Sequence, residues 1–214
     1  MSDKLRKLSE CQLYGILDLS YIDNSDAVSV ADAMIEGGVD LIQLRGKERP
    51  IEELVDLAAA LHELTARSST PLIVNDHTEI AVKVPVQGVH VGQDDDAVAD
   101  VRRRVDRKIL IGKSTHSLEQ ALAAQREDAD YIGFGPIFAT PTKPDSQPIG
   151  LKEIEGVHRN VVLPIFCIGG IKIDNLERVI TAGARRVAIV SGLLKAVDIA
   201  EYARNCKDLL NSAI

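Results

Sequence analysis

The sequence predicts an α/β protein with the (β/α)8 TIM barrel fold. Eight short apolar runs rich in β-branched residues recur along the chain, and segments with apolar residues at helical spacing lie between them. No GxGxxG motif follows the first run and no P-loop appears, so the commonest signatures of an open doubly wound sheet are missing. The 214 residues contain no linker or low-complexity tract, and we expect one domain over residues 1–214.

The predicted strands are apolar in succession rather than strictly alternating, which is typical of strands buried on both faces. They span residues 13–17, 40–44, 72–74, 89–91, 109–111, 131–134, 165–168 and 187–190. Apolar residues three and four positions apart predict helices over residues 28–36, 51–66, 118–125, 175–182 and 199–210. Residues 25–26 and 174–175 supply helix start signals, and Gly37, Gly38 and Gly183 supply stops. The region after Gly150 has the weakest helical pattern.

The composition excludes several classes of protein. No apolar segment is long enough to span a bilayer, and the apolar run over residues 13–19 is short and interrupted by Asp18, unlike a signal peptide. Three cysteines without metal-type spacing indicate reduced structural thiols, so we expect a cytoplasmic protein. A net charge of −7 disfavours binding to nucleic acid, and any anionic substrate therefore needs a local cationic pocket.

Polar residues that directly follow a strand carry the functional information, because the active site of this fold lies at the carboxyl ends of the strands. The second strand leads into Gln43, Arg45 and Lys47, which alternate and can therefore face one side together. They predict a cationic rim. The alternative is a solvated loop with ordinary surface charges.

Two carboxylates follow neighbouring strands. Asp76 ends the third strand and Asp95 follows the fourth, and carboxylate oxygens completed by water and a substrate phosphate suit Mg²⁺. We therefore predict Asp76 and Asp95 as the metal ligands. For Asp94 and Asp96, capping of the next helix is the preferred interpretation.

The loops after the fifth and sixth strands bring hydroxyl groups. Ser114 and His116 follow the fifth strand, although alone Ser114 fits a helix cap and an isolated histidine is more often structural. After the sixth strand, a segment stiffened by prolines carries Thr140, Thr142 and Lys143, and residues 144–150 fit a mobile lid.

Glycines mark the ends of the last two strands. Gly170 follows the seventh strand and Ser191 follows the eighth, at the loops that frequently form the phosphate site of a barrel. A glycine there lets backbone N–H groups approach an anion closely, although glycines also serve simple turns.

In order, the segments QLRGK, ND, GVHVGQDD, GKSTH, GFGPIFATPTK, CIGGI and VSG resemble the motif series of the thiamine phosphate synthase family. The resemblance covers the barrel from the second strand through the eighth. It implies that the pyrimidine diphosphate contacts Gln43, Arg45, Lys47, Asn75, Ser114 and Lys143, that Mg²⁺ binds Asp76 and Asp95, and that Thr140, Thr142, Gly170, Val190 and Ser191 surround the thiazole phosphate. Lys113 departs from the small or apolar residue expected there, and alternation would turn it away from the pocket.

By this resemblance the chain couples hydroxymethylpyrimidine diphosphate to hydroxyethylthiazole phosphate, giving thiamine phosphate and pyrophosphate. Departure of the diphosphate leaves a resonance-stabilised pyrimidine methylene cation, which the thiazole nitrogen attacks, so no strong base is needed. Mg²⁺ and the catalytic residues Arg45, Lys47, Ser114 and Lys143 would then assist the leaving group. Two alternatives are a thiazole tautomerase, in which His116 moves a proton, and a noncatalytic phosphate-binding regulator. Whether the chain forms a homo-oligomer stays open.

Overall fold

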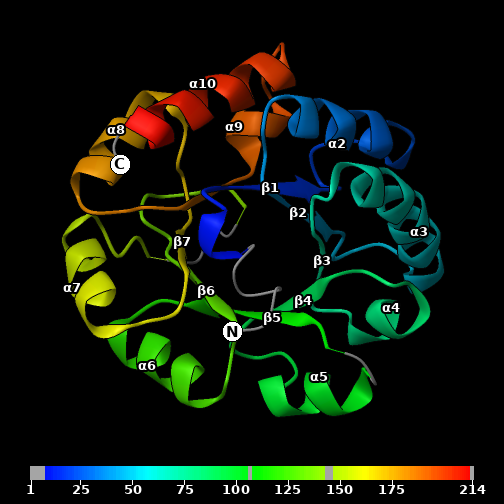
Figure 1. Ribbon diagram of the computed structural model, residues 1–214, viewed down its shortest axis with the longest axis horizontal. Coiled ribbons are helices and arrows are strands. Elements are labelled where there is room, and N and C mark those ends of the chain that lie inside the picture. The colour runs from blue at the N-terminus through cyan, green and yellow to red at the C-terminus, as the bar shows by residue number, and fades with distance from the viewer. Residues whose placement is uncertain (1–7, 106–107, 143–146, 213–214) are drawn as a thin grey trace.

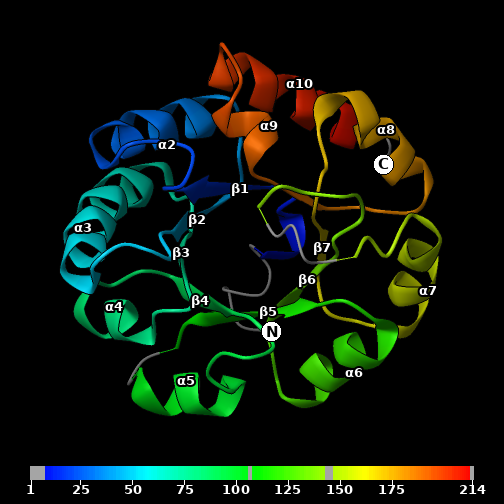
Figure 2. The ribbon, with the colours of Figure 1, turned by 180° about the vertical axis from the view of Figure 1, so that it is seen from behind.

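The computed structural model describes residues 8–105, 108–142 and 147–212. Its strands are all parallel and close into a barrel in sequence order, so the predicted fold is confirmed. Helices form a ring around the strands when the barrel is viewed from either end (Figure 1 and Figure 2). The strands are β1 (Leu13–Asp18), β2 (Leu41–Arg45), β3 (Leu72–Asn75), β4 (Gly88–Val91), β5 (Leu110–Thr115), β6 (Tyr131–Phe134), β7 (Ile165–Cys167) and β8 (Val187–Ile189).

The helices follow the predicted alternation. They are the short 3-10 helix η1 (Asn24–Asp26), α2 (Ala27–Glu36), α3 (Ile51–Ser68), α4 (Thr78–Lys83), α5 (Val98–Arg104), α6 (Leu118–Arg126), α7 (Lys152–Asn160), α8 (Ile173–Thr181), α9 (Ser191–Leu194) and α10 (Ile199–Ser212). The weak pattern after Gly150 forms α7. Helix α8 begins two residues earlier than predicted, because Asn175 accepts a hydrogen bond from the backbone N–H of Lys172 instead of starting the helix.

Side chains alternate between two apolar layers. Leu13 and Leu17 of β1 point outward into the layer between strands and helices, whereas Tyr14 and Ile16 point into the barrel. Inside the barrel, the ring of Phe166 packs edge-on against Tyr14 at 5.3 Å between ring centroids. Among the described residues the barrel is therefore a packed core below the carboxyl ends of the strands, which leaves the space above it for a ligand.

All three cysteines lie in the described part of the chain, are buried, and form no disulfide. Burial raises the pKa of Cys167 to about 12 and that of Cys206 to about 12, so these thiols are poor nucleophiles at neutral pH. The expectation of structural thiols is consistent with this. Within the described ranges, no helix combines the length and the apolar character needed to cross a bilayer.

Candidate active site

A pocket opens at the carboxyl ends of the strands, where the sequence places the candidate side chains. In Figure 2 the segment between β6 and α7 reaches over this end of the barrel. Side chains or backbone from nearly every strand end contribute to the wall. The predicted residues that line the pocket are Gln43, Arg45, Asn75, Ser114, Thr140, Thr142, Gly170, Val190 and Ser191.

The floor of the pocket is a continuous hydrogen-bonded chain of an amide, two phenols, an imidazole and a hydroxyl group. Gln43 Nε2 donates to Tyr14 Oη at 2.5 Å, and Tyr14 and Tyr131 share a hydrogen bond of 3.0 Å between their hydroxyl oxygens. His90 Nδ1 lies 3.2 Å from Tyr131 Oη, and His90 Nε2 lies 3.0 Å from Ser114 Oγ. Burial raises the pKa of both tyrosines above the ordinary value, so the phenols stay protonated. The floor thus offers directed hydrogen bonds without a carboxylate.

Sequence reasoning missed His90 as a pocket residue. It lies in β4 between Val89 and Val91, both buried in the outer apolar layer, so the alternation of the strand turns His90 inward. The alternation of buried residues was a signal that could have found this histidine.

Arg45 ends β2 and forms the cationic wall of the pocket. Its Nη1 donates to Asp18 Oδ2 at 2.5 Å, and the side chain of Asp18 is only 1% exposed. Asp18 was a second omission, because it had been considered only as an interruption of an apolar run. Its signal was its place as a polar residue at the end of a buried strand.

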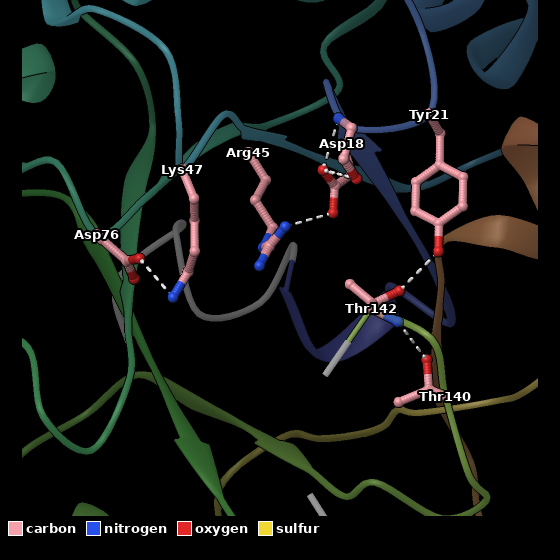
Figure 3. A network of polar contacts seen from close by, with 8 residues as sticks. Asp18, Tyr21, Arg45, Lys47, Asp76, Thr140 and Thr142 are labelled. Atoms are coloured by element: carbon pink, nitrogen blue, oxygen red, sulfur yellow. Dashed lines mark hydrogen bonds and ion pairs between the residues drawn. The ribbon is translucent and has the colours of Figure 1, made fainter. Parts of the chain in front are cut away.

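Lys47 lies beyond the end of β2, beside the pocket rather than in its wall. Its Nζ is 3.8 Å from Asp76 Oδ2, and the side chain is about half exposed, at 52%. Figure 3 shows Lys47 turned toward Asp76 and away from the guanidinium of Arg45. The predicted cationic rim is therefore divided between the pocket wall and the adjoining recess.

Asp76 and Asp95 lie together in that recess, as predicted. Asp76 has a φ of +59°, a left-handed conformation that is uncommon outside glycine, and its backbone N–H donates to His90 O at 2.8 Å. Asp95 accepts a hydrogen bond of 2.7 Å from the backbone N–H of Gly92. Burial raises the pKa of Asp76, and the neighbouring Asp95 raises it further, with only partial compensation from Lys47.

These two carboxylates fit a magnesium ion by their chemistry. Their mutual repulsion is relieved by a cation, and both supply hard oxygen atoms. Among the described residues there is no cluster of three or more metal-ligating side chains. A pair of carboxylates is nevertheless the kind of set that Mg²⁺ uses when water and substrate phosphate complete its coordination.

The capping interpretation of Asp94 and Asp96 was wrong. Helix α5 begins at Val98, and the residue before it is Ala97, which makes no side-chain cap. Asp96 instead accepts hydrogen bonds from Thr78 Oγ1 at 3.2 Å and from Arg104 Nη1 at 2.6 Å. It ties α4 to α5 by its side chain.

The residues after Gly112 belong to a longer β5 than predicted. Ser114 lies within the strand, and the cap of α6 is Ser117, whose Oγ accepts from the backbone N–H of Gln120 at 3.2 Å. Capping by Ser114 is therefore excluded. Lys113 Nζ lies 2.7 Å from Glu127 Oε2, so this side chain points away from the pocket, as alternation predicts. His116 lines the pocket, and its Nδ1 lies 2.5 Å from Gly135 O.

The loop after β6 brings two hydroxyl groups to the side of the pocket opposite Arg45. Thr142 Oγ1 is 3.1 Å from Tyr21 Oη, and the backbone N–H of Thr142 donates to Thr140 Oγ1 at 3.4 Å. Lys143 lies outside the described residues, as do residues 144–146 of the predicted lid. In the described part of the predicted lid, the backbone N–H of Ile149 donates to the backbone oxygen of Pro136 at 2.8 Å.

Gly169 and Gly170 follow β7 in left-handed conformations, with φ of +96° and +64°. A Cβ atom on Gly170 would lie 2.6 Å from Ala139 O and 2.7 Å from Phe138 Cβ. Glycine is therefore required here by the packing of the β6 loop, a reason that the sequence pattern did not reveal. Val190 and Ser191 line the pocket, and α9 begins at Ser191.

The pocket thus has two polar ends of different character joined by the hydrogen-bonded floor. One end carries the guanidinium of Arg45, beside the recess that holds Lys47 and several carboxylates, those of Asp76 and Asp95 among them. The other carries hydroxyl groups and glycine-rich backbone. Among the described residues that line the pocket there is no carboxylate and no thiol, so neither serves there as base or nucleophile. The arrangement suits the joining of two anionic ligands by positioning rather than by covalent catalysis.

Comparison with known proteins identifies what the chain is similar to. Residues 13–193 match the family model described as thiamine monophosphate synthase. A thiamine-phosphate synthase of Pelotomaculum thermopropionicum is 41% identical over 97% of this chain and 95% of its own length, and one of Chloroflexus aurantiacus is 42% identical over 94% and 93%. Among solved structures, thiamine phosphate pyrophosphorylase from Pyrococcus furiosus superposes with a TM-score of 0.86 at 30% identity, covering 98% of both chains.

Proposed function

Because the chain belongs to the thiamine monophosphate synthase family and is a transferase that forms thiamine phosphate, we propose how its pocket binds and joins the two substrates. The observation that carries the proposal is the convergence of Arg45, the hydrogen-bonded floor and the two hydroxyl groups of the loop after β6 on one pocket. Two anions of different charge can be placed there, one at each end.

Hydroxymethylpyrimidine diphosphate occupies the end with Arg45. The guanidinium, with Lys47 and Lys143, attracts the diphosphate, and Asn75 and Ser114 add polar contacts. The pyrimidine ring lies on the floor, where Gln43 and Ser114 are held by the tyrosine and histidine chain. Fixed hydrogen-bonding groups suit a heteroaromatic ring that carries its own donors and acceptors.

Hydroxyethylthiazole phosphate occupies the other end. Thr140, Thr142 and Ser191 supply hydroxyl donors, and the backbone at Gly170 and Val190 forms the wall.

Mg²⁺ would be held by Asp76 and Asp95, with water and the diphosphate as its other ligands. When bound, it supplies positive charge that offsets the negative charge of the diphosphate. Lys47, 3.8 Å from Asp76, lies where it can contact both the carboxylate and a nearby phosphate oxygen.

The reaction breaks the bond between the pyrimidine methylene carbon and the diphosphate oxygen, and the electron pair leaves with the diphosphate. Arg45, Lys47 and Lys143 hold that developing charge, and Ser114 donates a hydrogen bond. The lone pair of the thiazole nitrogen then forms the new bond to the methylene cation. No proton leaves the reacting atoms, in agreement with the lack of a carboxylate or thiol among the described pocket residues.

A thiazole tautomerase is the second candidate, since His116 lines the pocket and a histidine can move a proton. The hydrogen bond from His116 to Gly135 O fixes the ring orientation, which serves either catalysis or structure. The carboxylates of Asp76 and Asp95 beside the pocket favour the synthase, because a metal ion held there would serve a diphosphate and a tautomerase expels none.

The test measures pyrophosphate release with both substrates and Mg²⁺, and with each component omitted in turn. We expect release only from the complete mixture. Isomerisation of a thiazole phosphate without the pyrimidine would favour the tautomerase, and binding without turnover would favour a regulator.

We also propose that residues 1–214 form one domain acting in the cytoplasm on small molecules, without nucleic acid or a membrane as partner. A net charge of −7 and buried cysteines support this. Whether the chain forms a homo-oligomer is decided by its mass in solution.

A further inference from the structure

The turn that follows β1, residues 18–21, lies between the two ends of the pocket, and we call it the β1 turn. It is closed by the backbone N–H of Tyr21, which donates to Asp18 O at 3.0 Å. Asp18 Oδ1 accepts two further hydrogen bonds, from Ser20 N–H at 3.0 Å and from Ser20 Oγ at 2.8 Å. These hydrogen bonds hold the backbone of the β1 turn and the carboxylate of Asp18 in one arrangement.

The first end of the β1 turn holds Arg45. In the parallel register of β1 and β2, Asp18 pairs directly with Arg45, and the backbone N–H of Leu19 donates to Arg45 O at 2.9 Å. Asp18 Oδ2 accepts from Arg45 Nη1 at 2.5 Å. Because a guanidinium is planar, a bond at one nitrogen fixes the directions of the other N–H donors. In Figure 3 the guanidinium of Arg45 lies between Lys47 and Asp18, and a dashed line joins it to Asp18.

The second end of the β1 turn holds Thr142. The Oη of Tyr21 lies 3.1 Å from Thr142 Oγ1, and the ammonium of Lys195 lies 5.0 Å from the centre of the Tyr21 ring. Either hydroxyl can be the donor in this pair. A fully ionised phosphate has no O–H to donate, so Thr142 would donate to the thiazole phosphate of the proposed function, and Tyr21 would then donate to Thr142. The phenol thereby orients the threonine O–H toward the ligand.

We infer that the β1 turn is a positioning element for both substrates, in which Asp18 orients Arg45 toward the diphosphate and Tyr21 orients Thr142 toward the thiazole phosphate. Neither residue contacts the reacting atoms. The inference rests on the proposed function for the identity of the two ligands. Its physical basis is that holding a flexible side chain before the ligand arrives removes part of the entropy loss on binding.

A positioning role and a purely structural role of the β1 turn predict different effects of substitutions on the binding of the two substrates. If the β1 turn only stabilised the barrel, a change at either end would weaken both substrates together or change thermal stability alone. If the β1 turn positions side chains, the Asp18 end affects the pyrimidine diphosphate and the Tyr21 end affects the thiazole phosphate.

Tyr21→Phe is the first test, because it removes the hydroxyl and keeps the ring next to Lys195. We expect the KM for thiazole phosphate to rise about three- to tenfold, as for loss of one neutral hydrogen bond, with the KM for pyrimidine diphosphate unchanged. The double variant Tyr21→Phe with Thr142→Val should be no worse than Thr142→Val alone, because Tyr21 acts through Thr142. Additive effects of the two substitutions would show that Tyr21 does not act through Thr142.

Asp18→Asn is the second test. The NH2 group of the new amide must face either Arg45 or the backbone N–H of Ser20. Both of these are donors, so one of the two hydrogen bonds is lost. We expect kcat/KM for pyrimidine diphosphate to fall about tenfold or more, with the KM for thiazole phosphate unchanged. Ser25→Ala is the control, since Ser25 lies exposed in the same connection between β1 and α2 and should leave both values as in the wild type.

Calorimetric titration of the protein with each substrate alone tests the positioning role of the β1 turn separately from the proposed function. A wild type that forms no thiamine phosphate would defeat the proposed function, while the binding of each ligand to the variants would still judge the β1 turn. Selective weakening of thiazole phosphate by Tyr21→Phe supports the inference even if Asp18→Asn does not fold. Equal weakening of both ligands, or no change in either, by Tyr21→Phe would overturn it.

Discussion

On the β2 side of the pocket, Arg45 and Lys47 each face a carboxylate, whereas on the β7 side the wall is formed by glycine backbone at Gly169 and Gly170. In the first region the positions of the functional groups depend on ion pairs between side chains. In the second they depend on a left-handed backbone path that admits no Cβ atom. The two regions should therefore fail in different ways, the first on removal of a charge and the second on addition of a methyl group.

Replacement of Arg45 should give the largest effect. Arg45→Gln removes the cation of the pocket wall and leaves the carboxylate of Asp18, only 1% exposed, without its ion-pair partner. We expect coupling to slow by about a hundredfold or more, and the free energy of unfolding to fall by about 3 kcal/mol or more. Steady-state kinetics and urea denaturation measure the two effects.

The double variant Asp18→Asn with Arg45→Gln separates those effects. It removes the buried charge as well, so it should recover part of the lost stability and none of the lost rate. Recovery of the rate would mean that Arg45 acts only as a structural partner of Asp18, and the comparison of the two regions would lose its basis.

Lys143 belongs to the charged region by its proposed role, although it lies outside the described residues. Lys143→Ala should slow coupling roughly ten- to a hundredfold, as expected for loss of a charge-assisted contact that strengthens in the transition state. Lys113→Ala is the matched control, because Lys113 is bonded to Glu127 away from the pocket and should leave the rate unchanged. Equal rates for wild type and Lys143→Ala, at limiting and saturating substrate, would refute the role of Lys143.

The contrast between the regions also explains what the sequence could predict. The eight strands and the polar residues at their ends follow from local patterns, since burial on both faces and strand alternation leave a mark in a few consecutive residues. Lys47 and Asp76 were recognised this way. Asp18 carries the same local signal at the end of a buried strand, but its role as the partner of Arg45 comes from pairing across β1 and β2, which requires the register.

The sequence predicts that Gly170 lets an anion approach closely, and that stays a prediction. The structure adds a second reason for the glycine, because a Cβ atom there would collide with the loop after β6, a contact between two distant segments. Tyr21 was missed for the same cause, because its partner Thr142 lies in that loop. Contacts between loops leave no periodic pattern in either segment, so sequence reasoning found the residues of the site more readily than the residues that support them.

Gly170→Ala tests the glycine region. The added Cβ would meet Ala139 O and Phe138 Cβ, so the β6 loop has to move away from the pocket. We expect the KM for thiazole phosphate to rise about tenfold, with a smaller change for pyrimidine diphosphate and a loss of roughly 1 to 3 kcal/mol in stability. Gly183→Ala is the control, because Gly183 also has a positive φ, +105°, but its nearest contact would be 4.0 Å away.

The control isolates the collision from the backbone strain. Gly183→Ala should lower the melting temperature and leave both KM values unchanged, since it lies at the end of α8 away from the pocket. If Gly170→Ala lowered stability without selective loss of thiazole phosphate, the β7 side would be a structural wall and not a substrate-binding one.

Asp95→Asn should give the smallest effect, because it changes only the affinity for Mg²⁺ in the charged region. Asparagine has nearly the same volume, and its side-chain oxygen can still accept from the backbone N–H of Gly92, so the loop keeps its shape. The variant removes one ligand charge next to Asp76. We expect the Mg²⁺ concentration for half-maximal pyrophosphate release to rise about three- to tenfold, with little change in melting temperature. Asp94→Asn, in the same exposed loop, should shift the titration much less. Superimposable Mg²⁺ curves for wild type and both variants would rule out the metal site, and an equal shift for both would show that the loop acts through its total charge and not through Asp95 as a ligand.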